Sequence, residues 1–224
     1  MDPRLRTAVD ESTCWYDDLF ALHGLGCGIS DGLWAGHGPP PPLHSAAKSV
    51  EPSARAEAAL RAVAAYEHCH VADSFGTLDL ADEMDLFFEA RWLHRPPLDA
   101  ALTALPAGWE SVTTEADLAA WTAIHGTSDV LLPGLLRRSS FRFLGHRVDG
   151  ELTAGAVTHL CAGAVGLSNV WAAPGHEVDW GELVRVVHAL HPGLAVVGYE
   201  QGDDLDRALD AGFSAVGPQL VWVR

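Results

Sequence analysis

The sequence predicts a mixed α/β fold, α+β in some schemes, in which a twisted and mostly antiparallel sheet carries helices on its flanks. Short segments of alternating polarity, typical of strands, are interspersed with longer segments whose apolar residues recur at helical spacing. Glycine or proline stands at many of the junctions between them. Hydrophobic residues make up 48% of the 224 residues and charged residues 20%, which is ordinary for a globular protein and argues against a disordered chain.

The first half of the chain is expected to contain a long helix, a loop and a β-α-β-β segment. The loop over residues 24–43 holds Gly24, Gly26 and Gly28 and then a run of four prolines. These glycines follow no predicted strand and open no helix, so a surface loop is favoured over a phosphate-binding site. The expected elements are a helix over 3–22, a strand over 45–50, a helix over 53–67 capped by Ser53, and strands around 71–80 and 85–94.

The second half has stronger start and stop signals. Thr114 suits the N-cap of a helix through His125, and Asp149-Gly150 suits a hairpin turn. Gly212 stands where glycine ends many helices. The expected elements are strands over 109–112, 141–147, 151–160, 164–171 and 194–200, helices over 114–125, 131–138, 179–190 and 203–211, and a last pair of strands over 213–216 and 219–223.

A division into two regions, 1–105 and 106–224, is expected from the placement of proline and glycine residues alone. Prolines and a glycine bracket a short Ala/Leu stretch between Arg95 and Gly108. The length of the chain fits either one large domain or two of roughly 110 residues.

The charge balance is strongly acidic, with 30 Asp and Glu against 14 Lys and Arg, a formal net charge of −16. Such a field repels phosphate backbones and acidic lipids, so no nucleic-acid or membrane partner is expected. No apolar run approaches the roughly 20 residues that span a bilayer. The polar, charged start of the chain is unlike a signal peptide, and the cysteines lack C-x-x-C spacing, so reduced thiols in a cytoplasmic protein are expected. These cysteines are Cys14, Cys27, Cys69 and Cys161.

The order β-α-α-β-β-β-α-β-α-β-β over residues 108–224 resembles the GNAT superfamily of N-acyltransferases. The segment from Asp203 to Phe213, DDLDRALDAGF, is similar to the penultimate helix of that family, which ends in Gly-Phe. The β-α-β-β order of residues 1–105 is similar to a partial second copy of the same fold. The resemblance therefore implies a GNAT-like sheet and a tandem arrangement with one degenerate half.

The resemblance also implies acetyl-CoA or another acyl-CoA as cofactor, in a notch between two parallel strands that splay apart, here 164–171 and 194–200. The family's pyrophosphate loop, Gln/Arg-x-x-Gly-x-Gly/Ala, is altered here because His176 and Asp179 replace its first two conserved residues. A carboxylate at Asp179 would repel a pyrophosphate. The cofactor-binding residues implied are Asn169, Val170, Trp171, Gly175, His176 and Gly181.

Three residues near the notch are the expected catalytic groups. Glu200 ends a strand and is the expected general base, although a helix cap or a solvated carboxylate also fits its position. Ala208 stands where many family members have a tyrosine acid, and Tyr199 is the nearest substitute, although a strand tyrosine also suits a core. Asn169 interrupts an apolar strand, where it suits orienting a ligand or bonding a neighbouring bulge.

A cluster of arginines supplies candidates for substrate binding. Arg137, Arg138 and Arg142 suit an acidic substrate or the cofactor's phosphates, and they equally suit a solvated face that balances the surplus acids. His68-Cys69-His70 is not completed by further ligands, so no metal site is expected.

The leading hypothesis from the sequence is an acyl-CoA-dependent N-acyltransferase that acts on a small-molecule amine. Asp179, His176 and Ala208 each remove a feature that the usual chemistry employs, and they favour a second hypothesis, a catalytically silent module that binds a metabolite or a protein partner. A third hypothesis keeps the cleft for a reaction without the cofactor. The sequence leaves a homodimer open.

Overall fold

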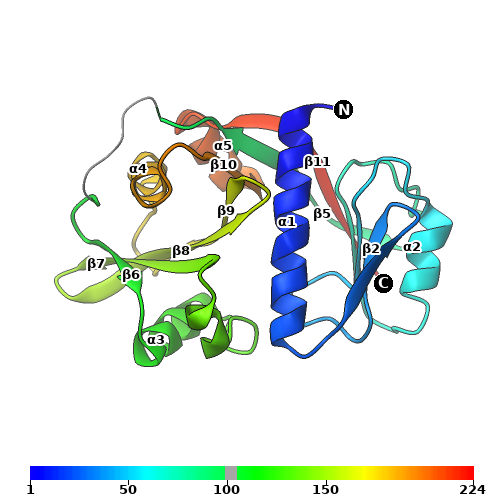
Figure 1. Ribbon diagram of the computed structural model, residues 1–224, viewed down its shortest axis with the longest axis horizontal. Helices are drawn as coiled ribbons and strands as arrows, with labels where there is room; N and C mark the ends of the chain where they lie inside the picture. The colour runs from blue at the N-terminus through cyan, green and yellow to red at the C-terminus, as the bar shows by residue number, and fades with distance from the viewer. Residues whose placement is uncertain (99–104) are drawn as a thin grey trace.

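The computed structural model of the protein describes residues 1–98 and 105–224. One sheet runs through the described chain in the order β1-β2-β3-β4-β11-β5-β10-β9-β8-β7-β6 (Figure 1). Its strands are β1 Cys27–Ser30, β2 Leu33–Gly36, β3 Ala47–Ser49, β4 His70–Asp73, β5 Asp85–Arg95, β6 Trp109–Val112, β7 Phe141–Val148, β8 Glu151–Cys161, β9 Ala164–Ala172, β10 Ala195–Glu200 and β11 Ser214–Val223. The helices are α1 Pro3–Leu22, α2 Ala56–Ala62, α3 Glu115–His125, α4 Trp180–Leu190 and α5 Gly202–Asp210, with a 3₁₀ helix, η1, at Pro133–Arg137.

The sheet is mixed and mostly antiparallel, which confirms the predicted fold class. Among the described strands, only β3 with β4 and β9 with β10 pair in parallel. No helix in the described part of the chain is long and apolar enough to cross a membrane.

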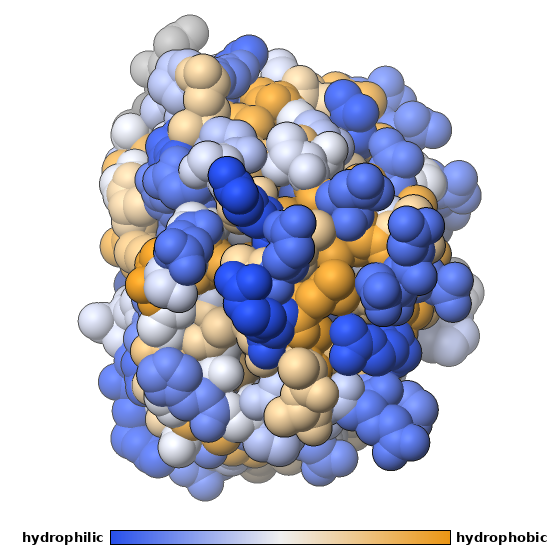
Figure 2. Space-filling model, turned by 90° about the vertical axis from the view of Figure 1, so that its right-hand side faces the viewer, coloured by the Kyte–Doolittle hydropathy of each residue, from blue (hydrophilic) through white to orange (hydrophobic). Residues whose placement is uncertain are grey.

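Helices cover both faces of the sheet and bury separate apolar clusters. On one face, Leu183 and Val187 of α4 pack with Val165 and Val196 of the sheet, and Ala208 of α5 belongs to the same cluster. On the other face, α1 crosses the middle of the sheet, with α3 farther along it (Figure 1). Figure 2 shows the face of the molecule on which α2 lies. This face is mainly hydrophilic, with an apolar band in its middle.

The last strand, β11, lies between β4 and β5, and β5 lies between β11 and β10. Strands from 1–105 and from 106–224 therefore alternate in the centre of one sheet. Residues 99–104, inside the expected break between the two regions, lie outside the described residues.

Three predictions about individual elements are wrong. The last two strands are the single strand β11, because Gly217 and Pro218 pair with Trp92 and Arg91 of β5 instead of making a turn, and the irregularity is a bulge just before them, between Ala215 and Gly217. The loop over 24–43 contains the hairpin of β1 and β2, which turns at Asp31-Gly32, both with positive φ. Helix α2 starts only at Ala56, and Ser53 does not cap it.

The prediction that all four cysteines are reduced thiols is also wrong. Cys14 of α1 forms a disulfide with Cys161 at the end of β8, with their Cα atoms 6.3 Å apart, while Cys27 and Cys69 are free. The two partners are 147 residues apart, so their spacing in the sequence carried no signal of the bond. The disulfide fastens α1 to the end of β8.

Candidate functional site

The parallel strands β9 and β10 part from each other and leave a notch. They pair from Ala164 to Gly166 on β9 and from Ala195 to Val197 on β10, and the pairing ends there. Farther along β9, the register with β8 shifts, so that Ser168 faces Val157 and Trp171 faces Gly155. The one extra residue on β9 makes a bulge at Asn169, whose φ is 51°. Because no pairing of β9 with β10 is found beyond Gly166 in the described chain, this stretch of β9 suits the addition of an extended ligand.

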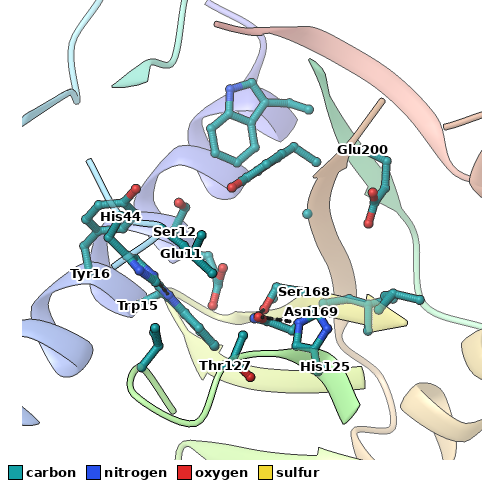
Figure 3. A pocket seen from close by; sticks show the side chains of 18 residues that line it. Glu11, Ser12, Trp15, Tyr16, His44, His125, Thr127, Ser168, Asn169 and Glu200 are labelled. Atoms are coloured by element: carbon teal, nitrogen blue, oxygen red, sulfur yellow. Dashed lines mark hydrogen bonds between the residues drawn. The ribbon is translucent and has the colours of Figure 1, made fainter. Parts of the chain in front are cut away.

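The notch opens into a cavity of about 280 Å³ on the α1 side of the sheet. Figure 3 shows Glu11, Ser12, Trp15 and Tyr16 on one side of this space, with Ser168, Asn169 and His125 across it. The remaining walls come from the loop at His44, from β5 and from the end of β10. The lining residues are Glu11, Ser12, Trp15, Tyr16, Leu43, His44, Trp92, His125, Thr127, Val130, Gly166 to Val170, and Gly198 to Glu200.

Tyr199 and Glu200 lie on opposite faces of β10. Val197 packs against α1 and Val196 against α4, so the two-residue period of a strand turns Tyr199 toward α1 and Glu200 toward the helices behind the notch. The Tyr199 ring meets Trp92 edge-on at 5.3 Å between centroids. Tyr199 remains 39% exposed, although the protein around its hydroxyl raises its pKa above the ordinary value, chiefly by desolvation.

Burial also perturbs Glu200. Loss of water around its carboxyl, helped by the negative charge of Asp204, raises the pKa of Glu200 to about 8. A carboxyl with such a pKa exchanges its proton near neutral pH, which is the property that a general acid or base requires.

A second polar group in the cavity centres on the bulge. His125, at the end of α3, meets the Asn169 side chain with 3.2 Å between Nε2 and Oδ1, and Asn169 Nδ2 donates to Ser168 Oγ at 3.0 Å. Burial lowers the pKa of His125, so the ring is neutral at pH 7, and its Nε2–H donates to the Asn169 oxygen. This network fixes the Asn169 side chain at the mouth of the notch.

The floor of the cavity holds a buried chain of charges. Glu11 Oε1 lies 2.6 Å from His159 Nδ1, and the other ring nitrogen of His159 lies 3.2 Å from Asp18, which also pairs with Arg138. The two carboxylates outweigh burial and raise the pKa of His159, which favours a protonated ring that donates to both. Burial raises the pKa of Glu11 despite this contact.

The loop before α4 does not fit a pyrophosphate. Asp179 caps α4, since its Oδ1 accepts from the backbone N–H of Glu182 at 2.8 Å, and this uses a donor that an anion would need. Glu182 in the first turn and Glu177, with 82% of its side chain exposed, add two more carboxylates. The positive end of the helix is therefore surrounded by negative charge.

The predicted site residues divide into those at the cavity and those elsewhere. Asn169, Val170, Tyr199 and Glu200 line the cavity, whereas Trp171 is 8% exposed and packs in the core among α3 side chains. Gly175, His176 and Gly181 lie on the altered loop and its helix, outside the cavity lining.

The three arginines do not line the cavity. Arg137 pairs with Glu115 at the surface, Arg138 pairs with Asp18, and Arg142 lies on β7 near His191. Among the described residues, no group of histidine, cysteine and acidic side chains has the arrangement of a metal site.

Sequence reasoning missed the wall that α1 supplies. Glu11 and Ser12 stand in a helix whose irregular apolar face gave no direction to a cavity. The sequence held one signal related to this wall, namely its single lysine, Lys48, which lies in a short strand of small residues and contacts Ser12.

The fold matches solved structures over nearly the whole chain. A GCN5-related N-acetyltransferase from Kribbella flavida superposes with a TM-score of 0.66 and 14% identity over 96% of this chain and 95% of its own. A protein of the GNAT family from Novosphingobium aromaticivorans gives 0.61 and 15% over 98% and 95%. No protein-family model matches the sequence, and no curated protein matches it. The chain therefore has the GNAT fold, as the sequence predicted.

Proposed function

We propose that this chain, which has the GNAT fold, is an N-acyltransferase that moves an acyl group from a thioester in the β9–β10 notch to a small amine in the adjoining cavity. The observation that carries the proposal is the continuity of notch and cavity. Residues from Gly166 to Asn169 border both, so a carbonyl held in the notch faces an amine held in the cavity. Holding the two reactants together supplies much of the rate of such a transfer.

The cavity suits a small amine with an apolar part. Trp15, Tyr16, Trp92 and Tyr199 offer aromatic surface, which attracts a cationic ammonium and packs against hydrocarbon. Glu11 and Glu200 supply negative charge, and no arginine or lysine is among the lining residues.

Two side chains on β10 would move the protons. An ammonium must lose a proton before it attacks a carbonyl, and Glu200, which borders the notch from the α4 face of β10, accepts that proton through water when it is ionised. Tyr199 stays protonated at neutral pH because its pKa is raised, so it keeps a proton to donate to the departing sulfur.

Acetyl-CoA or another acyl-CoA is the donor that the fold suggests. The free backbone of β9 at the bulge suits the amide groups of a pantetheine arm, and the carboxylates around the start of α4 do not suit the diphosphate. The donor is therefore held mainly by its arm and acyl end.

The acidic loop also favours a second candidate, a silent module that binds a metabolite in the same cavity. Asp179 blocks the usual anion site, and Ala208, which replaces the usual tyrosine, is fully buried and offers no proton. Calorimetry separates the candidates.

The test is titration of the purified chain with acetyl-CoA, followed by thiol release in the presence of a panel of small amines. We expect binding in the micromolar range and amine-dependent release of thiol. Saturable binding without turnover on any amine would favour the silent module. No binding at millimolar acetyl-CoA would overturn coenzyme A as the donor.

A further inference from the structure

A buried lysine lies directly behind a serine of the cavity wall. Lys48 of β3 is 1% exposed, and its Nζ lies 2.6 Å from Ser12 Oγ and 3.5 Å from the backbone oxygen of Val9. The rings of Tyr16 and Trp92 cover it at 5.4 and 5.3 Å from Nζ to the centroids. The amine is thus enclosed, and Ser12 is its contact on the side of the cavity.

The surroundings of Lys48 favour a neutral amine. Among the described residues no carboxylate forms an ion pair with it, and an unpaired ammonium is costly to bury. Glu11, Asp10 and Asp17 on α1 act on it from a distance and favour its charge, but burial outweighs them and lowers the pKa of Lys48 to about 7.

A neutral Lys48 leaves its lone pair for Ser12. Nζ also lies 3.5 Å from the Val9 oxygen and faces the rings of Tyr16 and Trp92, so Ser12 Oγ at 2.6 Å is its nearest polar neighbour among the described residues. As an ammonium Lys48 donates to Ser12 Oγ, whereas the neutral amine has a lone pair that accepts from the Ser12 hydroxyl. Ser12 then donates its hydroxyl proton to the amine. A serine activated by an adjacent base is the arrangement of a nucleophilic site.

We propose that Ser12 is a nucleophile that accepts an acyl group from a small ester or thioester in the cavity, with Lys48 as its general base. Ser12 lines the cavity, and its side chain stands beside Glu11 on the wall that faces Ser168 and Asn169 (Figure 3). This activity goes beyond the proposed amine acylation and needs neither coenzyme A nor an amine.

The step balances without an external reagent other than water. The Ser12 Oγ–H proton passes to Lys48 Nζ while Oγ forms a bond to the acyl carbon, and the bond from that carbon to the leaving oxygen or sulfur breaks. Lys48 returns the proton to the leaving group. Water then attacks the acyl serine, Lys48 takes the water's proton and passes it to Oγ, and the free acid leaves.

The class of substrate follows from the walls. The cavity of about 280 Å³ has room for a short acyl chain on a compact leaving group, and its aromatic lining favours an uncharged, partly apolar ester. A donor that carries a negative charge is repelled by the Glu11 carboxylate in the cavity wall, so uncharged donors are preferred.

The test uses p-nitrophenyl acetate with the purified full chain, free of coenzyme A and amines. We expect a burst of one nitrophenolate per chain and one acetyl group on the peptide that contains Ser12. Ser12→Ala should abolish the burst. Lys48→Arg, whose guanidinium stays protonated and cannot act as a base near neutral pH, should slow it about 100-fold or more.

Two controls distinguish a loss of folding from a loss of the acylation reaction. Thr7→Ala removes a hydroxyl from the same helix away from the cavity lining and should leave the burst unchanged. Lys48→Met offers an uncharged variant beside the charged Lys48→Arg, and circular dichroism should show that both are folded. Acetylation of another residue, or a wild-type rate in a folded Lys48→Arg or Lys48→Met variant, would overturn the proposal.

Discussion

The carboxylate of Glu11 occupies the space in which a side chain on Gly166 would begin. A Cβ on Gly166 would overlap the Glu11 carboxylate, and His159 holds that carboxylate in place from the other side at 2.6 Å. Glycine at this strand position lets α1 approach β9 closely enough to form the floor of the cavity.

Gly166→Ala should therefore lower the free energy of unfolding by about 1–3 kcal/mol, because the added methyl pushes Glu11 off its imidazolium partner. Urea unfolding of both proteins measures the difference. Gly181→Ala, in the first turn of α4, should change the free energy of unfolding by less than about 1 kcal/mol, because the helix preference of alanine is offset by its 3.3 Å contact with the capping oxygen of Asp179. Equal effects of the two substitutions would show that Glu11 is free to move.

Ionisation of Glu200 should appear in both stability and rate. The pKa of Glu200 is about 8 in the folded protein against an ordinary value of 4.5, so its contribution to stability is full below about pH 4.5 and is lost as the pH rises through 8. The slope between these values reaches at most about 1.4 kcal/mol per pH unit. Glu200→Gln should flatten this part of the profile, as measured by urea unfolding across pH.

The same substitution tests the proton transfer. Acyl transfer should rise with pH through about 8 in the natural protein, as Glu200 ionises, and Glu200→Gln should lower the rate about 100-fold or more while the fold is kept. An unchanged rate in a folded Glu200→Gln variant would remove Glu200 from the reaction.

Asp179→Asn should tighten the binding of coenzyme A several-fold. Asparagine caps helices as well as aspartate does, so this variant keeps the start of α4 and removes only the charge. The gain should shrink at high salt, because screening weakens the repulsion that the substitution removes. Calorimetry at two salt concentrations measures both effects, and an unchanged affinity would show that the diphosphate binds elsewhere.

Cys14→Ser should lower the free energy of unfolding by about 2–5 kcal/mol, because the disulfide closes a long loop and restricts the unfolded chain. Thermal unfolding under non-reducing conditions measures the loss. Cys27→Ser changes a free cysteine and serves as the control. Addition of a reductant should bring the natural protein to the stability of Cys14→Ser and leave that variant unchanged.

Local sequence signals were sufficient to predict a helix or a turn where characteristic capping or turn residues mark it. Thr114 caps α3, and Asp149-Gly150 turns the β7–β8 hairpin, so these elements were predicted closely. Gly217-Pro218 carries the same kind of signal but lies within a strand, because pairing with β5 on one side and β4 on the other outweighs the local preference.

The sequence indicated some residues of the candidate site and missed others. Asn169 and Glu200 were predicted as site residues because each is a polar residue within or at the end of an apolar strand, and both line the cavity. Ser12 and Lys48 are 36 residues apart on elements that only the tertiary fold brings together. No spacing rule connects such a pair, because α1 crosses the sheet at a place set by packing.

The position of β11 also bears on how the chain folds. Trp92 of β5 pairs with Tyr199 and Gly217, partners more than a hundred residues farther along the chain, so the centre of the sheet consists of contacts between distant segments. Such topologies fold slowly, because long loops must close before the contacts that reward them form. Until β11 is in place, β4 and β5 present open edges, and we expect the nascent chain to be most prone to aggregation at these two strands.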